Sequence, residues 1–374
     1  MVSRQQGEAL VLVTGATGFV GSHCVKALLE GGYRVRGSVR SLDNEKKNGP
    51  ILALDNNTQN GEKRLELVQA DLLDEDSWKK AVRGCTYVLH VASPFPLAQP
   101  KDPDEVIKPA VEGTLNVLRA AAGEPSVRRV VVCSSAAAVM SGHTDRVDFD
   151  ESVWGMENLA KVSPYELSKT LAEKTAWEFV EKSEKEGRRL EMAVINPVFI
   201  LGPAIHGNDF TSAELIANVL NGKMPVVPRI VIPIVDVRDV AKAHLKAMTL
   251  PEAAGRRFLL SNETGSDMNT MARAMQQEFA EQGYRIHAWD PPNWFVYLAS
   301  FFDPVLKMSY PMIGKTFNMS KKARAEVLGM KEIVDWKTAA LAMAYSVIEF
   351  GLVKKTNKYK GVPVEYRLDY PIRS

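Results

Sequence analysis

The chain has 374 residues, enough for two domains or for one large domain with a smaller partner. Hydrophobic residues make up 45% and charged residues 25%, a composition that argues against disorder and supplies a sizeable core. The 47 basic and 45 acidic side chains leave a net charge of only +2, so no strong field favours nucleic acid or an anionic membrane as a partner.

The cysteines and histidines give no sign of a disulfide framework or a metal site. Cys24, Cys85 and Cys133 are widely separated and odd in number, which favours a reducing compartment. The histidines lack the spacing typical of zinc ligands, so we expect no metal. The N-terminal segment lacks the apolar run of a signal peptide, and no segment reaches the length of a membrane span. We therefore expect a cytoplasmic protein.

Over the first two hundred residues, short β-branched runs alternate with helical patterns. Strands are predicted at residues 10–15, 33–39, 65–69, 87–91, 129–133 and 191–195, and helices at 18–29, 77–82, 104–122 and 164–185. The polar stretch 41–61 is predicted to be a surface loop with one helical turn. This alternation predicts an α/β fold with a Rossmann-type, doubly wound parallel sheet.

The regular alternation fades after Pro197. We predict that the Rossmann domain covers residues 8–200 and also receives residues 230–250. A smaller α/β substrate-binding domain, interleaved with the first, would cover residues 201–350, followed by a C-terminal tail at 351–374. Eight aromatic residues fall between positions 289 and 317. This segment is interpreted as packing of the second domain, with a substrate lid, a subunit contact or an interfacial membrane patch as alternatives.

A glycine-rich segment, GATGFVG, lies between the first predicted strand and its helix. The first glycine permits a tight turn, the second lets the backbone approach a pyrophosphate, and the third allows the helix to pack closely on the strand. Unpaired N–H groups at the helix start then bind the anion. The predicted cofactor contacts in this segment are Gly15, Thr17, Gly18, Phe19, Val20 and Gly21.

The end of the second predicted strand indicates which dinucleotide binds. A site for NAD places Asp or Glu there, whereas this chain has Arg40, whose guanidinium suits a 2′-phosphate. Lys47 could add a second positive charge, so we predict NADP(H). Asp71, with Leu72 beside it, is placed to accept a hydrogen bond from the adenine amino group. A helix N-cap is the alternative role for Asp71.

Tyr165 and Lys169 are four residues apart in a segment with strong helical character, so both side chains should project from one face. A free tyrosine has a pKa near 10, and a nearby ammonium group can lower this pKa by roughly one to three units. Ser135 follows the predicted strand 129–133 and can donate to a substrate carbonyl oxygen as negative charge develops. Ser134 is expected only to end that strand.

With these motifs in this order, the sequence resembles the extended short-chain dehydrogenase/reductases. Within them it looks most like the branch containing dihydroflavonol 4-reductase, cinnamoyl-CoA reductase and the microbial aldehyde and ketone reductases. The resemblance covers roughly residues 8–350 and rests on VTGATGFVGSH, VRGSVR, ADLLD, VLHVASP, EVIKPAVEGTLNVL, VRRVVVCSS, SPYELSKTLAE and INPVFILGP.

The resemblance implies a set of site residues. The triad would be Ser135, Tyr165 and Lys169. The NADP contacts would come from Arg40, Lys47, Asp71, Leu72, Val91, Ala92, Ser93, Tyr165, Lys169, Pro197, Val198, Phe199, Ile200 and Ser212.

Two departures from the family pattern affect the expected chemistry. Many extended members carry an asparagine where this chain has Ala110, so a water relayed by such an asparagine is not supported. The NWYCYGK signature of cinnamoyl-CoA reductases is replaced by SPYELSK, which disfavours reduction of lignin-type CoA thioesters.

We expect an NADPH-dependent reductase of a hydrophobic aldehyde or ketone. Its partner would be a small hydrophobic carbonyl or alcohol substrate, without nucleic acid, and the chain would be a monomer or a homodimer. The alternatives are a 3β-hydroxysteroid dehydrogenase-like enzyme, a nucleotide-sugar epimerase, and a non-catalytic regulator that senses a dinucleotide. Arg40 argues against the epimerase, and retention of Tyr165 and Lys169 argues against the regulator.

Overall fold

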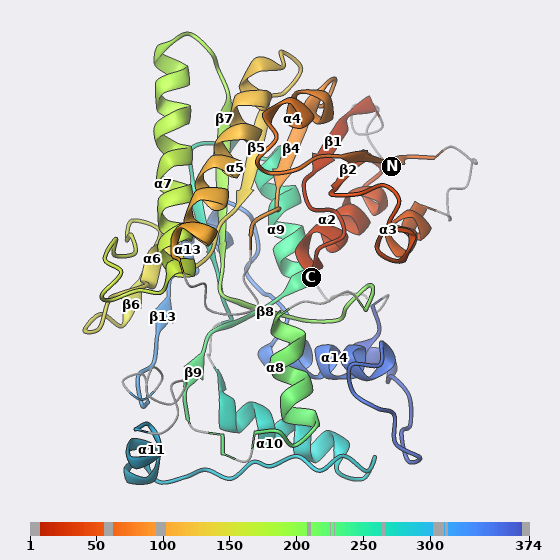
Figure 1. Cartoon of the computed structure of the whole chain (residues 1–374), viewed down its shortest axis with the longest axis vertical. Coiled ribbons are helices and arrows are strands. Elements are labelled where there is room, and N and C mark those ends of the chain that lie inside the picture. The colour runs from red at the N-terminus through yellow and green to blue at the C-terminus, as the bar shows by residue number, and fades with distance from the viewer. Residues whose placement is uncertain are drawn as a thin grey trace. The chain divides into compact units, whose positions relative to one another are not determined.

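The computed structural model describes residues 8–55, 63–94, 102–207, 211–224, 226–227, 229–262, 266–301, 310 and 313–368 (Figure 1). The chain divides into two compact units. The first comprises Met1–Pro197, Arg238–Leu260 and Ser320–Lys331, and the second comprises Val198–Val237, Ser261–Met319 and Glu332–Ser374. The two units are therefore interleaved along the sequence.

The first unit is built from short strands and longer helices. Its strands are β1 (Leu10–Val13), β2 (Arg34–Val39), β3 (Leu65–Gln69), β4 (Tyr87–His90), β5 (Arg129–Cys133), β6 (Asp148–Phe149), β7 (Glu191–Pro197) and β11 (Arg257–Leu260). Its helices are α2 (Phe19–Glu30), α3 (Glu45–Leu52), α4 (Glu75–Val82), α5 (Asp104–Gly123), α6 (Ala137–Met140), α7 (Pro164–Lys185), α9 (Val237–Thr249) and α13 (Lys322–Glu326), with 3-10 turns at Ala53–Asp55 and Pro251–Ala253.

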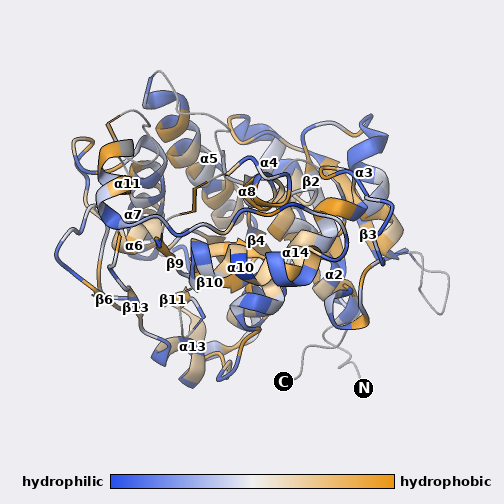
Figure 2. Ribbon diagram, turned by 90° about the horizontal axis from the view of Figure 1, so that it is seen from below, coloured by the Kyte–Doolittle hydropathy of each residue, from blue (hydrophilic) through white to orange (hydrophobic). Residues whose placement is uncertain are grey.

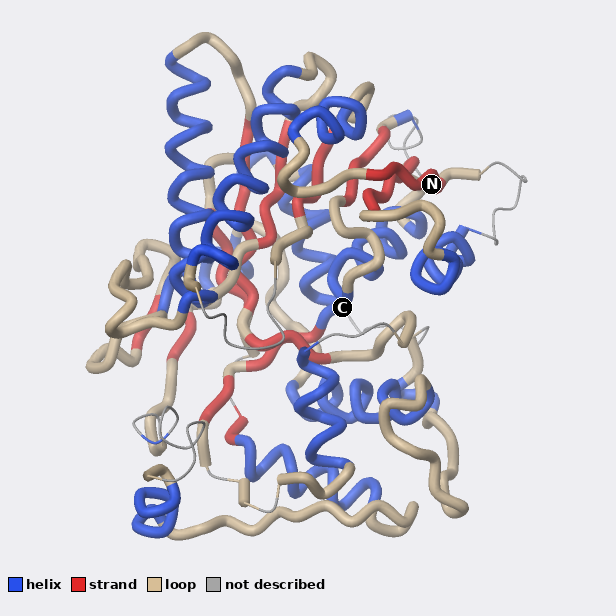
Figure 3. The backbone as a smooth tube through the Cα atoms, viewed as in Figure 1, coloured by secondary structure: helices blue, strands red, loops and turns tan. Residues whose placement is uncertain are grey.

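Seven strands of this unit form one sheet in the order β11-β7-β5-β4-β1-β2-β3. Each neighbouring pair is parallel, and Figure 3 shows the strands side by side between helices. The order of the strands reverses at β1, which lies between β2 and β4. Ligands of open α/β sheets bind at the carboxyl ends of the strands beside such a reversal.

Both faces of the sheet are covered. Leu12 of β1 belongs to a buried cluster with Trp78 of α4 and Val117 of α5. Because successive side chains of a strand point to opposite faces, the fully buried Val11 and Val13 face the other side, where α2 packs. In Figure 2 a helix such as α10 carries both hydrophilic and hydrophobic colours. A strand buried on both faces has a continuous apolar sequence, as β1 does with LVLV.

The predicted Rossmann-type parallel sheet is confirmed, and β3, β5 and α7 have the predicted bounds. The polar stretch 41–61 differs, because it contains the eight-residue helix α3 and a 3-10 turn, while residues 56–62 lie outside the described residues. Asn44 makes this helix possible by accepting the N–H of Lys47 at 3.1 Å. Strand β11 was not predicted, since its four residues follow the point where the alternation fades.

The second unit is smaller. Its elements are β8 (Phe199–Leu201), α8 (Thr211–Leu220), β9 (Val231–Ile232), β10 (Ile234–Asp236), β12 (Ser266–Asp267), α10 (Met268–Phe279), α11 (Asn293–Ala299), β13 (Asn318–Met319), α14 (Trp336–Glu349) and a 3-10 turn at Val364–Tyr366. Strands β8 and β10 pair in parallel, and β9 and β12 pair antiparallel. Helix α14 packs against α8 and α10 and is buried over Ala339–Ile348, so it forms the centre of this unit.

The aromatic-rich segment belongs to the second unit. Trp294 of α11 and Phe301 after it are each 65% exposed. Phe302 lies outside the described residues. The interpretation of this segment as packing of the second domain stays a prediction. Within the described chain, no helix combines the length and the apolar composition that crossing a bilayer requires.

Candidate active site

The glycine segment after β1 makes a tight turn into α2. Gly15 has a φ of +66°, a value that residues with a side chain rarely adopt. The N–H of Gly15 donates to Ser38 Oγ at 3.1 Å, and the N–H of Gly18 donates to the Gly15 carbonyl at 2.9 Å. Among the described residues no side chain caps α2, and its first turn carries no acidic residue. The backbone N–H groups at this helix start can therefore meet an anion.

The space at this turn fits a dinucleotide pyrophosphate. A Cβ at Gly21 would lie 2.2 Å from the carbonyl oxygen of Gly15, so the third glycine is required for α2 to approach β1. A Cβ at Gly18 would lie 3.2 Å from the same oxygen, and Gly18 is exposed. The backbone of Gly18 is thus open to a ligand, which is what a phosphate cradle needs.

Thr14, which is not among the site residues predicted from the sequence, joins the carboxyl ends of β1 and β4. Its Oγ1 accepts the N–H groups of Val91 at 2.9 Å and Ala92 at 2.8 Å. With both lone pairs occupied, the hydroxyl donates to Nδ1 of His90 at 3.0 Å. These bonds fix the segment that leads to Ser93, where cofactor contacts are predicted.

Thr14→Val is expected to lower the free energy of unfolding by about 2 to 6 kcal/mol, because the part-buried N–H groups of Val91 and Ala92 lose their acceptor and each unsatisfied N–H costs about 1 to 3 kcal/mol. Urea unfolding monitored by circular dichroism measures this change. Thr249→Val is the control, since Thr249 is exposed at the end of α9 and its hydroxyl donates only to carbonyls of its own helix. The control should stay within about 0.5 kcal/mol of wild type. Equal stability of the two variants would contradict the role of Thr14.

Arg40 follows β2 and is exposed, as a side chain that meets a cofactor phosphate must be. Asn48 of α3 holds the loop after Arg40, since its buried Nδ2 donates to the carbonyls of Ser41 and Leu42, both at 3.0 Å. Lys47 precedes Asn48 on the same helix. Asn48 therefore connects the segments of the two predicted phosphate-binding residues, and it is not among the site residues predicted from the sequence.

Asp71 follows β3, and its side chain is exposed with Oδ1 accepting the N–H of Leu73 at 2.9 Å. Asp74, and not Asp71, caps α4 by accepting the N–H groups of Asp76 at 3.1 Å and Ser77 at 3.3 Å. The alternative role of Asp71 as a helix cap is therefore wrong. Its hydrogen bond to adenine stays a prediction.

Helix α7 presents the predicted tyrosine and lysine as their spacing requires. It begins with a capping box, in which Ser163 Oγ accepts the N–H of Glu166 and the Glu166 carboxylate accepts the N–H of Ser163 at 2.7 Å. Tyr165, in the first turn, is hydrogen-bonded to Ser135. The Nζ of Lys169 lies 5.8 Å from the centre of the Tyr165 ring. The structure thus brings the three residues of the predicted triad together.

The pKa of Tyr165 differs from the expectation. Lys169 was expected to lower it, whereas burial raises the pKa of Tyr165 to about 12 and the hydrogen bond with Ser135 opposes this only in part. Burial also lowers the pKa of Lys169. A phenol with a raised pKa keeps its proton at neutral pH, which is the form that a general acid needs.

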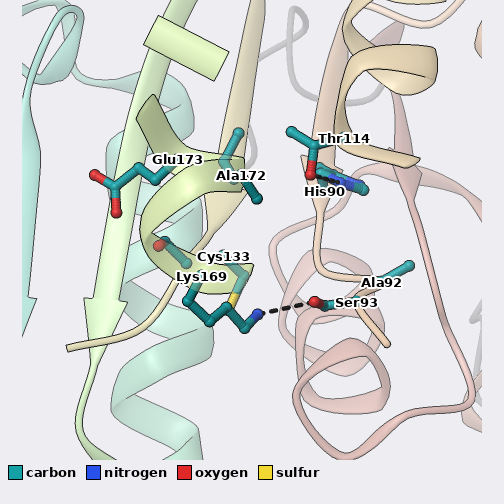
Figure 4. A pocket seen from close by; sticks show the side chains of 10 residues that line it. His90, Ala92, Ser93, Thr114, Cys133, Lys169, Ala172 and Glu173 are labelled. Carbon is teal, nitrogen blue, oxygen red and sulfur yellow. Dashed lines mark hydrogen bonds between the residues drawn. The ribbon is translucent and has the colours of Figure 1, made fainter. Parts of the chain in front are cut away.

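A cavity of about 20 Å³ lies beside Lys169 and has room for about one water molecule (Figure 4). Lys169 Nζ donates to Ser93 Oγ at 2.9 Å. Burial and the charge of Lys169 lower the pKa of His90 to about 3, so its imidazole is neutral. Nε2 of His90 then donates to Thr114 Oγ1 at 3.4 Å, and Thr114 donates to the carbonyl of Ala110 at 2.8 Å. Ala110 thus joins this network through its backbone.

The predicted cofactor contacts fall in both units. Those in the first unit are the glycine turn, Arg40, Lys47, Asp71, Leu72, Val91, Ala92, Ser93, Tyr165, Lys169 and Pro197, the last residue of β7. Those in the second unit are Val198, Phe199 and Ile200, at or in β8, and Ser212 in α8. All of these assignments stay predictions.

A parallel sheet with a phosphate cradle at its reversal point, and a tyrosine and lysine one turn apart beside it, defines a dinucleotide-dependent protein of the Rossmann type. The family model described as the NAD dependent epimerase/dehydratase family matches residues 11–260. The chain belongs to this family, that of the extended short-chain dehydrogenase/reductases.

Similar proteins are reductases. A cinnamoyl-CoA reductase of Medicago truncatula is 39% identical over 257 residues, 67% of this chain and 76% of the relative. Tetraketide alpha-pyrone reductase 1 of Arabidopsis thaliana is 38% identical over 264 residues, 69% of this chain and 78% of the relative. The crystal structure of yeast methylglyoxal/isovaleraldehyde reductase complexed with NADPH has a TM-score of 0.74 and 26% identity, over 91% of this chain and 99% of that one. The predicted class, an NADP(H)-dependent oxidoreductase, is confirmed.

Proposed function

We propose that this protein is an NADPH-dependent reductase that converts a hydrophobic aldehyde or ketone into the corresponding alcohol. The observation that carries the proposal is the hydrogen-bonded pair of Tyr165 and Ser135 beside Lys169, in the unit that also contains the glycine turn. The yeast structural neighbour, titled a methylglyoxal/isovaleraldehyde reductase, supports a carbonyl substrate of this kind.

Each residue of the triad has one role in this reaction. Bound NADPH supplies the hydride that adds to the carbonyl carbon. Tyr165 donates its proton to the carbonyl oxygen, which becomes the hydroxyl of the product. Ser135 donates a hydrogen bond to the same oxygen and positions it. Lys169 stabilises the phenolate left after proton transfer and holds the nicotinamide ribose.

Arg40→Ala is expected to raise the KM for NADPH about tenfold while the KM for NADH stays within about twofold, because an exposed charged contact to the 2′-phosphate is lost. Initial rates with each cofactor measure this difference. Arg34→Ala is the matched control, since Arg34 is an exposed arginine at the opposite end of the same strand. A tenfold preference of the wild-type enzyme for NADH, about 1.4 kcal/mol in transition-state binding, would contradict the assignment of Arg40.

The substrate class is tested by NADPH oxidation across a panel of aliphatic, aromatic and steroidal carbonyls. An aromatic acyl-CoA thioester belongs in the panel as a second candidate, because several of the relatives, at 39% to 41% identity, are named cinnamoyl-CoA reductases. Turnover of hydrophobic aldehydes or ketones above the thioester supports the proposal. Turnover of the thioester alone would contradict it.

A further inference from the structure

A buried ion pair adjoins the triad, and neither of its members is among the site residues predicted from the sequence. Glu173 follows Lys169 by one turn of α7, and its side chain is 0% exposed. Nε of Arg257, from β11, donates to Glu173 Oε1 at 2.5 Å. An isolated buried charge is strongly unfavourable, so each member requires the other.

Further contacts fix the guanidinium of Arg257. One terminal nitrogen donates to the carbonyls of Glu151 at 3.0 Å and Val153 at 2.8 Å. The guanidinium carbon lies 3.7 Å from the centre of the Trp154 ring. A planar group held by stacking and by the hydrogen bonds that it donates to several acceptors has little freedom to move. The carboxylate of Glu173 therefore has a fixed location within the first unit.

Asn196 of β7 connects this carboxylate to the backbone of Ser135. The side chain is fully buried, and its Nδ2 donates to Glu173 Oε2 at 2.6 Å and to the Ser135 carbonyl at 3.1 Å. Both partners are acceptors, which fixes the orientation of the amide. Its Oδ1 has no hydrogen-bond partner among the described residues. The contribution of Asn196 therefore lies in the two bonds that it donates.

The two hydrogen bonds donated by Asn196 connect the ion pair to residues of the triad. The hydroxyl of Ser135 is hydrogen-bonded to Tyr165, so a displaced Ser135 backbone displaces the group beside the proton donor. Glu173 also acts on Lys169, because its negative charge opposes the lowering of the Lys169 pKa by burial. Figure 4 shows Glu173 and Lys169 on successive turns of α7 with their side chains pointing in different directions. The carboxylate of Glu173 thus affects Ser135 through Asn196, and it affects Lys169 through its charge.

We propose that Asn196 is a positioning residue. Its two hydrogen bonds hold the backbone of Ser135 at a fixed place relative to the Glu173–Arg257 ion pair. This proposal rests on the proposed catalytic role of Ser135 and adds a residue to the same site. Reaction rates are sensitive to such placement, since a displacement of about 1 Å can cost about a hundredfold.

A double-mutant cycle with Asn196→Leu and Ser135→Ala tests the proposal. Leucine is close to asparagine in size and has no donors. With Ser135 present, Asn196→Leu is expected to lower kcat for carbonyl reduction about ten- to hundredfold, with the KM for NADPH within about twofold. In the Ser135→Ala background the same substitution should lower kcat less than about twofold, because Asn196 acts through Ser135.

Asn269 of α10 provides the matched control, because its buried Nδ2 also donates to two carbonyls, those of Val227 at 3.0 Å and Ala288 at 3.1 Å. Asn269→Leu should have the same effect in both backgrounds. Equal effects of Asn196→Leu in the two backgrounds, or no effect on kcat, would overturn the positioning role and leave Ser135 catalytic. Full activity of Ser135→Ala would instead overturn the proposed function.

Asn196→Asp gives a second test that does not depend on how well the leucine variant folds. A protonated carboxyl retains one O–H donor, whereas an ionised one donates nothing and adds a negative charge next to Glu173. The ratio of wild-type to variant kcat is therefore expected to rise with pH. A ratio that stays constant with pH would overturn the proposal.

Discussion

Tyr165→Phe is expected to lower kcat for carbonyl reduction about 10²- to 10⁴-fold, the range that a positioned general acid contributes. The variant keeps the ring beside Lys169 and loses the hydroxyl that is hydrogen-bonded to Ser135. Because the change removes a proton donor and no phosphate contact, the Kd for NADPH should change less than about twofold. Steady-state NADPH oxidation and fluorescence titration with NADPH measure the two quantities.

Tyr359→Phe serves as the control for this experiment. The Tyr359 hydroxyl donates to Glu349 Oε1 at 2.8 Å in the second unit, so the control also loses one hydrogen-bonded phenol. Its kcat should stay within about twofold of wild type. Wild-type turnover by Tyr165→Phe would exclude Tyr165 as the acid.

Gly21→Ala is expected to disrupt the glycine turn, which is predicted to bind the pyrophosphate of the cofactor. The added methyl carbon would lie 2.2 Å from the Gly15 carbonyl oxygen and 3.0 Å from its carbonyl carbon, distances that force the backbone to move. If α2 moves away from the turn, its N–H groups leave the phosphate. Loss of one charge-assisted hydrogen bond costs about 1.5 to 3 kcal/mol, which raises the Kd for NADPH about ten- to hundredfold. Isothermal titration with NADPH measures this loss.

The matched control is Gly123→Ala, at the end of α5, where an added methyl group meets no atom within 4 Å. This variant should bind NADPH as the wild type does. Thermal unfolding of both variants separates a local shift of α2 from general loss of the fold. An unchanged Kd for NADPH in Gly21→Ala would refute the close packing at this turn.

Sequence periodicity was sufficient to predict six strands of the sheet, but it did not predict the edge strand β11. After its first residue, β5 (Arg129–Cys133) is a continuous apolar run, and it lies next to long helices in the sequence, so local residues were sufficient to predict it. Strand β11 has only four residues, and its pairing with β7 depends on a contact between segments some sixty residues apart, as Arg257 lies opposite Val194. Helix α3 depends on the cap supplied by Asn44, a single polar residue in a polar stretch.

The same distinction applies to the candidate site. Gly15, Tyr165 and Lys169 were found because their chemistry requires a fixed spacing along the chain. Glu173 carried a signal that was not used, a charged residue one turn after Lys169 on the same helix. Asn196 and Arg257 had no such signal, because only the folded sheet brings β7 and β11 next to α7.

The late position of β11 in the sequence has a consequence for biosynthesis. β7 ends at Pro197, but the strand that pairs with its outer edge begins only at Arg257. Until the ribosome has made that strand, the nascent sheet exposes an unpaired edge. The carboxylate of Glu173 also lacks its ion-pair partner, Arg257. The first unit, which also includes Ser320–Lys331, therefore completes its fold only after Val198–Val237 and Ser261–Met319 of the second unit have been synthesised. An N-terminal fragment that stops after β7 would not be a self-sufficient domain.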